Sequence, residues 1–249
     1  MRTVSDRTSA ARDRARRSAR AGHAALAAAL ALACLGAATA GAAPGRAGAP
    51  RATASAALLR DGFAGGRLDP ARWTQVWGET RVAGGAALLR SARPLTAAET
   101  HSSLVTSRRS FADFVLRLEL GAVAQLRAAS PNPWETAWVV FRYRGPHDYY
   151  YFLLKPNGWE LGKKQGSDAQ VFLATGGSPR LPVGARARVR IAAAGPVVAV
   201  AVDGVPVVRY RDSAPLPGGA VGLYEEDAVA RFADVRVTPL PRPAPRRTA

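Results

Sequence analysis

The residue types that could bind or transform a ligand gather in one stretch of this chain, HDYYYFLLKPNGWELGKK at residues 147–164. Ten of the 18 aromatic residues lie between Trp134 and Phe172. Flat rings pack against the C–H faces of sugars, while the lysines and the glutamate among them can hydrogen-bond hydroxyl groups. The composition of this stretch therefore predicts a carbohydrate-binding surface with acid–base groups at hand.

A hairpin would decide which of these side chains share a face. Asn157-Gly158 favours a tight turn, and a turn centred there pairs residues whose numbers sum to 315, such as Lys155 with Glu160. Because side chains alternate across a strand, one face is predicted to enter the core. That face carries Tyr150, Phe152, Leu154 and Leu161, and the opposite face carries Tyr149, Tyr151, Leu153, Lys155, Glu160 and Lys164.

The preceding segment WETAWVVFRYR, residues 134–144, is predicted to be the neighbouring strand. Alternation puts Trp134, Trp138 and Arg142 on one of its faces, and we expect that face to adjoin the polar face of the hairpin. The predicted catalytic residues are Arg142, Tyr151, Lys155 and Glu160, and the predicted ligand contacts are Trp134, Trp138, Tyr149, Trp159 and Lys164.

Structural roles account for the same residues. An exposed Lys155–Glu160 pair across two strands would contribute about 0.2–1 kcal/mol to stability without any part in catalysis. Tyr149 and Tyr151 would equally cap a half-buried sheet, and Arg142 is one of many arginines. The sequence leaves both interpretations open.

The motif content leaves enzymatic activity undecided. The sequence has no spaced carboxylates of the E-x-D-x-x-E type, no G-x-S-x-G elbow and no H-E-x-x-H pair. A glycosidase needs two carboxyl groups roughly 5–10 Å apart, but alternation turns Glu135 away from the face expected for Glu160. Lyase chemistry is compatible with Arg142 neutralising an acidic sugar and with Tyr151 or Lys155 moving protons.

The elements that must position these residues are predicted to be strands. DFVLRLEL (residues 113–120) and RARVRI (residues 186–191) alternate with period two, as in an antiparallel sheet with one covered face. Asp203-Gly204 favours a two-residue hairpin turn, and Pro206 predicts an edge strand or a bulge after it. Twelve or more such strands without helices predict an all-β fold, a two-sheet antiparallel jelly-roll sandwich, over residues 56–238.

The ends of the chain have a different composition. Residues 1–42 combine an arginine-rich start with an apolar, alanine-rich run, the layout of a secretory signal. Cys34 would serve a lipoprotein route and Arg16-Arg17 a twin-arginine route, although neither motif is well formed. Residues 43–55 are predicted to be a linker and residues 239–249 a disordered Pro/Arg-rich tail. We therefore expect a secreted protein with no transmembrane span in its mature form.

The charge of the chain bears on its partners. The formal net charge is +17, and almost all of the basic residues are arginines scattered along the sequence. Nucleic-acid binding would be better supported by basic residues clustered on one element, so no nucleic-acid partner is expected. The excess suits an acidic polymer. We expect a monomer that binds a polysaccharide or oligosaccharide, neutral or anionic.

Four segments occur in an order that resembles a known group of proteins: RDGFAGGRLDPARW, AWVVFRYRGPHDYYYF, VAVDGVPVVRY and GGAVGLYEEDAVARFADVRV. They resemble secreted concanavalin A-like lectin/glucanase proteins related to laminin-G domains and to 3-keto-disaccharide hydrolases, often labelled family 16 glycoside hydrolase-like. The resemblance implies a jelly roll whose first and last strands pair. It implies glycan binding or processing by a glycoside hydrolase-like or polysaccharide lyase-like protein; the alternative is a non-catalytic laminin-G-like adhesion module of the cell envelope.

The resemblance also suggests a structural calcium ion where the first and last strands meet, with Asp61 and Asp234 as candidate ligands. Calcium takes six to eight oxygen ligands, so backbone carbonyls would have to complete the shell. No cofactor is expected for catalysis. The acidic run Glu225-Glu226-Asp227 could also hold a cation, but a solvated loop is the expected structure there.

Overall fold

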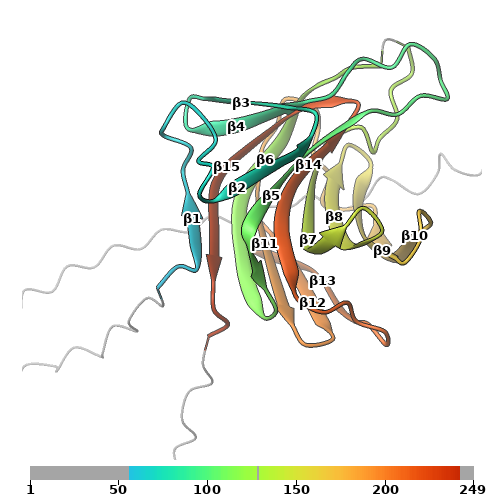
Figure 1. The fold of residues 1–249 in the computed structure, drawn as a ribbon. Helices are drawn as coiled ribbons and strands as arrows, with labels where there is room; N and C mark the ends of the chain where they lie inside the picture. Colours follow the sequence, from blue (N-terminus) through green and yellow to red (C-terminus); the bar gives the residue numbers. More distant parts are fainter. Residues whose placement is uncertain (1–55, 128, 242–249) are drawn as a thin grey trace, which may run out of the picture. The chain divides into compact units, whose positions relative to one another are not determined.

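The computed structural model describes residues 56–127 and 129–241, which form fifteen β-strands (Figure 1). The predictions for residues 1–42 and 43–55, and for the tail beyond Pro241, lie outside the described residues. None of the described residues is helical, so none belongs to a helix that could cross a membrane. The predicted all-β class is confirmed.

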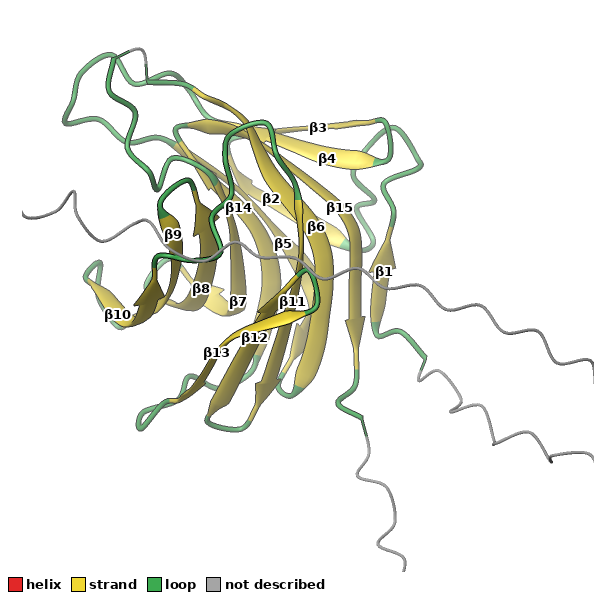
Figure 2. Ribbon diagram, turned by 180° about the vertical axis from the view of Figure 1, so that it is seen from behind, coloured by secondary structure: helices red, strands yellow, loops and turns green. Residues whose placement is uncertain are grey.

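Two antiparallel sheets face each other, as seen from both sides in Figures 1 and 2. Sheet A runs in the order β13 (Val205–Arg211), β12 (Val197–Val202), β11 (Ala187–Ala194), β6 (Phe114–Gln125), β15 (Ala228–Thr238), β4 (Ala86–Arg90) and β3 (Glu79–Ala83), with β1 (Leu59–Asp61) also paired to β15. Sheet B runs in the order β10 (Gln170–Gly176), β9 (Gly158–Gln165), β8 (Asp148–Lys155), β7 (Ala137–Gly145), β14 (Gly219–Glu226), β5 (Ser102–Phe111) and β2 (Trp73–Trp77). The predicted jelly-roll sandwich is confirmed.

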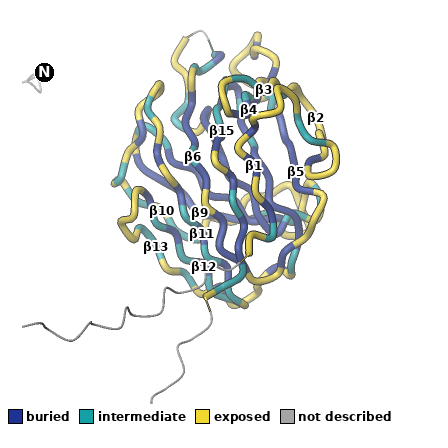
Figure 3. The backbone as a smooth tube through the Cα atoms, turned by 90° about the vertical axis from the view of Figure 1, so that its left-hand side faces the viewer, coloured by how far each residue is buried: buried dark blue, intermediate teal, exposed yellow. Residues whose placement is uncertain are grey.

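The main hydrophobic core fills the space between the sheets. Phe141, Tyr150 and Phe152 of sheet B are fully buried there together with Phe114 and Phe232 of sheet A. Burying one large apolar side chain contributes about 1.5–3 kcal/mol, so this layer dominates the stability of the sandwich. Figure 3 shows buried residues along the strands and exposed residues in the connections between them.

Three predictions, about a turn, an edge strand and the pairing of the chain's first and last strands, are confirmed. Asp203 and Gly204 have φ values of 48° and 84°, the left-handed backbone that a two-residue hairpin turn requires. Strand β13 lies at the edge of sheet A, and its pairing with β12 shifts next to Pro206. The first and last strands pair, with Leu59 opposite Val237 (Figure 1).

The hairpin of residues 148–165 forms, but its predicted register is wrong by two residues. Lys155 faces Gly158 and Leu153 faces Glu160, so the turn consists of Pro156 and Asn157. Proline suits the first central position of a tight turn because its φ is fixed. A shift of two keeps the same side chains on each face. The predicted division of the hairpin into a core face and an opposite face therefore survives.

The predicted position of Arg142 is wrong. A bulge in β7 places Arg142 at φ 50°, and its side chain leaves the face that carries Trp138. The buried guanidinium instead donates to the carbonyl oxygens of Ala112 (3.1 and 3.0 Å), Gly195 (2.9 Å) and Leu216 (3.0 Å). Arg142 therefore ties three chain segments together at one end of the sandwich.

We predict that Arg142→Ala lowers the free energy of unfolding by about 2 kcal/mol or more, because buried carbonyl groups lose a charged donor. Arg144→Ala, an exposed arginine two residues away, is the matched control and should change stability little. Urea denaturation monitored by tryptophan fluorescence measures both. Equal stability of the two variants would contradict the structural role given to Arg142.

Candidate functional site

Sheet B is apolar on its outer face as well as on its core face. This outer layer, called the aromatic face below, consists of Leu104, Trp138, Val140, Tyr149, Tyr151 and Leu153, with Tyr143 and Tyr224 packed against it. The Trp138 ring lies 5.0 Å from the Tyr151 ring and 5.6 Å, edge to face, from the Tyr224 ring. The sequence prediction that Trp138, Tyr149 and Tyr151 share one face is confirmed.

Gly162 makes room for the centre of this face. It lies opposite Tyr151 across β8 and β9, and a Cβ atom at Gly162 would stand 2.3 Å from the phenol ring. The ring can therefore lie over the β9 backbone, and its hydroxyl donates to Glu160 Oε1 at 2.9 Å. Burial and the negative charge of Glu160 raise the pKa of the Tyr151 phenol, so it remains a donor.

Lys155 completes this group from the end of β8. Its Nζ donates to Glu160 Oε2 at 2.9 Å, so both oxygens of Glu160 accept hydrogen bonds. The side chains of Lys155 and Glu160 are only 15% and 9% exposed. The alternative of an exposed surface pair is therefore wrong. Glu160 orients Tyr151 and Lys155 on the aromatic face.

A carboxyl group that the sequence prediction missed lies on the same side of sheet B. Glu226 ends strand β14, and Tyr224 donates its hydroxyl to Glu226 Oε1 at 2.7 Å. Burial raises the pKa of Glu226 to about 6, although the Tyr224 hydrogen bond and the charge of Lys164 act in the opposite direction. A carboxyl group with such a pKa can take up and return a proton near neutral pH.

The expectation of a solvated loop at Glu225-Glu226-Asp227 is wrong. Glu225 and Asp227 are fully buried, and Glu226 is half-buried. Strand alternation in the segment Gly222 to Glu226 was the available signal, since it puts Tyr224 and Glu226 on one face. The density of acidic residues suggested a loop instead.

The remaining predicted ligand contacts lie in different surroundings. Trp134 is 43% exposed, and its carbonyl oxygen accepts a hydrogen bond from Trp138 Nε1 at 2.8 Å. Lys164 lies opposite Tyr149 and forms a 3.4 Å pair with the exposed Asp168. Both adjoin the aromatic face.

Trp159 does not reach the aromatic face. It packs on the core side against Phe152, at 6.4 Å between ring centroids, and donates to the carbonyl oxygen of Ser178 at 2.8 Å. Alternation explains this position, because Trp159 shares its face with Leu161. The predicted ligand contact at Trp159 is therefore wrong.

Asp61 and Asp234 line one cavity of about 250 Å³ beside the β1–β15 pairing. Both oxygens of Asp61 accept hydrogen bonds, one from the Phe63 amide (2.7 Å) and one from Trp73 Nε1 (2.8 Å). Arginines line the same cavity, and the described residues contain no group of three metal-binding side chains. The side chains that line this cavity do not fit a calcium ion, which needs six to eight oxygen ligands. Calcium stays a prediction that the geometry does not support.

A second buried carboxyl group, Glu225, lies on the core side of β14. Glu225 Oε2 accepts hydrogen bonds from Ser91 Oγ (3.3 Å) and from the Ala228 amide (2.8 Å), whereas Oε1 has no hydrogen-bond partner among the described residues. Burial, reinforced by the charges of Asp227 and Glu226, raises the pKa of Glu225 to about 8. Glu225 is therefore mostly protonated at neutral pH.

We predict that protonation of Glu225 makes stability depend on pH. Its pKa rises from an ordinary value of 4.5 to about 8 on folding, so the folded state holds the proton more tightly. Stability is then greatest below pH 4.5 and falls as the pH rises to about 8, by at most about 1.4 kcal/mol per pH unit. Urea midpoints between pH 5 and 9 measure this fall. Glu225→Gln should remove most of it above pH 6, and an unchanged slope in this variant would contradict the assignment.

Comparisons with known proteins come from a family model and from solved structures. Residues 61–238 match the model of a family described as 3-keto-alpha-glucoside-1,2-lyase-like domain. The carbohydrate-binding module CBM66 from Bacillus subtilis is 20% identical, with a TM-score of 0.54 over 67% of this chain and 94% of that chain. The Bacillus licheniformis beta-glucanase is 11% identical, with a TM-score of 0.55 over 72% and 97%.

A Bacillus subtilis protein of unknown function with a galectin-like fold is 15% identical, with a TM-score of 0.57 over 74% of this chain and 96% of that chain. At these identities the solved structures establish the shared fold alone. No curated protein sequence matches the chain significantly.

Proposed function

The chain belongs to the 3-keto-alpha-glucoside-1,2-lyase-like domain family, and on that premise we propose that its aromatic face binds a sugar residue of a glycan and that Glu226 moves a proton there. The observation that carries the proposal is the half-buried carboxyl group of Glu226, which accepts a hydrogen bond from the Tyr224 hydroxyl at 2.7 Å beside the packed rings, and burial raises its pKa to about 6. Trp138 and Tyr151 are buried beneath this site. Tyr224, Glu226 and Lys164 at its margin are half-buried and can reach a sugar. A ring suits the apolar face of a sugar, and the hydroxyl and ammonium groups suit its oxygens.

The donors around Glu226 support a particular assignment of roles. Burial and the charge of Glu226 raise the pKa of the Tyr224 and Tyr149 phenols, so both act as hydrogen-bond donors rather than bases. Lys164 is close enough for its positive charge to act on Glu226. Glu226 is thus the base, and the phenols and Lys164 are the candidates for donating a proton to a leaving oxygen.

The family description implies an elimination across C1 and C2 of a glucoside that carries a ketone at C3. The ketone acidifies the proton on C2. Glu226 would take that proton, the C1–C2 double bond would form, and the C1–O bond would break with its electrons leaving on the oxygen, which then takes up a proton. One ionisable carboxylate is enough for this reaction, whereas glycosidase chemistry uses two, and both oxygens of Glu160 are already hydrogen-bonded.

A non-catalytic glycan-binding protein is the second candidate. The similarity in fold to a carbohydrate-binding module favours it. The secretory layout of residues 1–42 supports an extracellular glycan as the ligand in every case.

We predict that Glu226→Gln lowers turnover by about 100-fold or more, because the acid–base group is lost. The substrates are 3-keto disaccharides and neutral and acidic polysaccharides, with reducing ends and the absorbance of unsaturated products as readouts. Wild-type turnover should rise with pH through about 6, as Glu226 ionises. Glu79→Gln, an exposed glutamate on β3, is the control and should keep full activity.

The outcomes separate the candidates. Full turnover in Glu226→Gln would contradict the catalytic assignment. Binding that is lost in Trp134→Ala or Lys164→Ala, without products from any substrate, would favour the binding protein. If no glycan binds the wild type, the proposal fails and the adhesion module is favoured.

A further inference from the structure

Four arginines lie side by side on the outer face of sheet A, the sheet that does not carry the aromatic face. Arg60 on β1 is opposite Arg236 on β15, Arg236 is opposite Arg117 on β6, and Arg117 is opposite Arg190 on β11. Neighbouring strands are about 4.8 Å apart, so the row spans about 14 Å. Residues far apart in the sequence thus form one continuous basic row.

Within the described part of the chain, the four arginines of this row form no ion pairs. Among the described residues, none of the four guanidinium groups forms an ion pair or a side-chain hydrogen bond, and the Nε atom of Arg236 is buried without a partner. Of the carboxylates on this face, Glu119 is hydrogen-bonded to Arg231, whereas Asp234 lies beside the row. Like charges directly opposite each other destabilise a sheet. Desolvation and the charges of Arg190 and Arg236 accordingly lower the pKa of Arg117.

The surface is hollowed on both sides of the row. One cavity of about 260 Å³ is lined by three arginines and by Glu119, and the cavity of about 250 Å³ next to β1 is lined by Arg60, Arg236 and Asp61. Asp234, at a bulge in β15, borders both cavities. The guanidinium groups can therefore be approached from the solvent.

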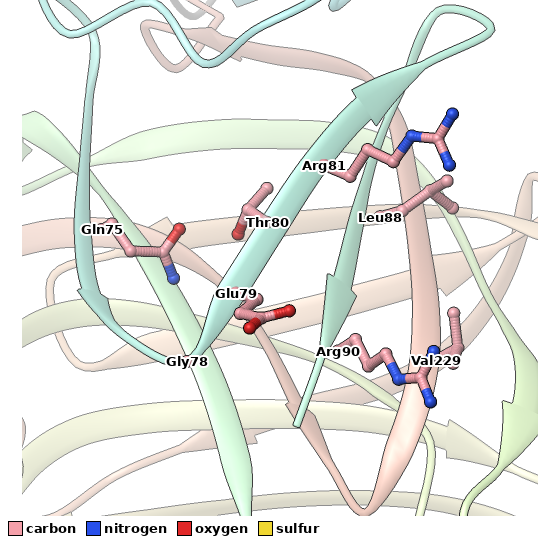
Figure 4. A pocket seen from close by; sticks show the side chains of 8 residues that line it. All are labelled: Gln75, Gly78, Glu79, Thr80, Arg81, Leu88, Arg90 and Val229. Atoms are coloured by element: carbon pink, nitrogen blue, oxygen red, sulfur yellow. The ribbon is translucent and has the colours of Figure 1, made fainter. Parts of the chain in front are cut away.

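The basic surface continues beyond the row onto β3 and β4. A larger cavity of about 630 Å³ lies there, and Figure 4 shows Arg81 and Arg90 projecting from neighbouring strands along its wall, with Leu88 and Val229 beside them. Arg81 and Leu88 are in register with Arg231 of β15.

We propose that the arginine row Arg60–Arg236–Arg117–Arg190 binds an acidic polysaccharide, a chain of sugars bearing carboxylate or sulfate groups that lies across the strands of sheet A. A guanidinium group pairs with such anions through two parallel hydrogen bonds. This site is separate from the aromatic face and does not rest on the function proposed for it.

The lining of the row favours this ligand over nucleic acid. Single-stranded nucleic acid binds through bases stacked on aromatic rings, and none of the residues lining the two cavities beside the row is aromatic. Duplex DNA is bound by an element that enters a groove, whereas this row lies within a sheet. Small side chains lie next to the row on β11 and β12, among them Ala192, Ala199 and Ala201. They leave the guanidinium group of Arg190 uncovered on this side.

The test measures binding of the full chain to polygalacturonate and chondroitin sulfate by affinity electrophoresis, with dextran and duplex DNA as comparisons. Arg117→Ala/Arg190→Ala should weaken binding to both acidic polysaccharides at least about tenfold. The matched control is Arg67→Ala/Arg144→Ala, which removes the same charge from two exposed arginines outside the row and should change binding less than about twofold. Turnover at the aromatic face should be the same in both variants.

Stability provides a second readout, which also shows that the variants fold. Removing Arg117 relieves repulsion within the row, so Arg117→Ala should raise Tm at low salt. The proposal is overturned if the control loses as much affinity as the row variant, since diffuse charge then explains binding. It is also overturned if duplex DNA binds as tightly as the acidic polysaccharides, if neither of these polymers binds, or if Arg117→Ala lowers Tm.

Discussion

Burial of sheet B on both faces is the constraint on which the rest of the structure depends. Its central strands place Phe141, Tyr150 and Phe152 in the core between the sheets and Trp138 and Tyr151 in the outer layer. A sheet with one solvated face would alternate apolar and polar residues, whereas YYYFLL supplies apolar or aromatic residues to both faces. The aromatic run that first suggested a ligand site is therefore required twice over by packing. Only the polar groups at its margin remain to be explained by function.

Strand parity made much of this predictable from the sequence. The faces of the hairpin were correct even though its register was wrong by two, because an even shift leaves parity unchanged. Parity failed at Arg142, where the bulge depends on carbonyl groups contributed by segments distant in the sequence. Strand alternation was not applied to Glu226, because the run of three acidic residues suggested a loop. Long-range contacts and the end of a strand are the features that local patterns do not encode.

The buried and half-buried carboxyl groups fall into two classes, according to how far hydrogen bonds and opposite charges offset the cost of their burial. Glu160, with Tyr151 and Lys155, is satisfied and fixed by two hydrogen bonds. Glu225 is buried and Glu226 is half-buried, and their hydrogen bonds only partly offset the cost of removing a charged carboxylate from water. The pKa of each carboxyl group is raised for this reason. Incompletely compensated groups cost stability and are concentrated at functional sites. Glu226 can exchange a proton with a ligand on the aromatic face, whereas Glu225 faces the core and affects stability alone.

The basic residues illustrate what sheet formation adds to composition. Along the sequence the arginines are scattered, which argued against nucleic acid, although the basic excess suited an acidic polymer. Pairing of β1, β15, β6 and β11 brings four of them into one row, although nothing in the local sequence around Arg60 or Arg236 indicates it. A row of like charges opposes the pairing that creates it. The strands pair nonetheless because their other faces bury Leu116, Ile191 and Val237 in the core. This burial offsets the repulsion between the arginines, so the sandwich can hold the proposed anion-binding surface.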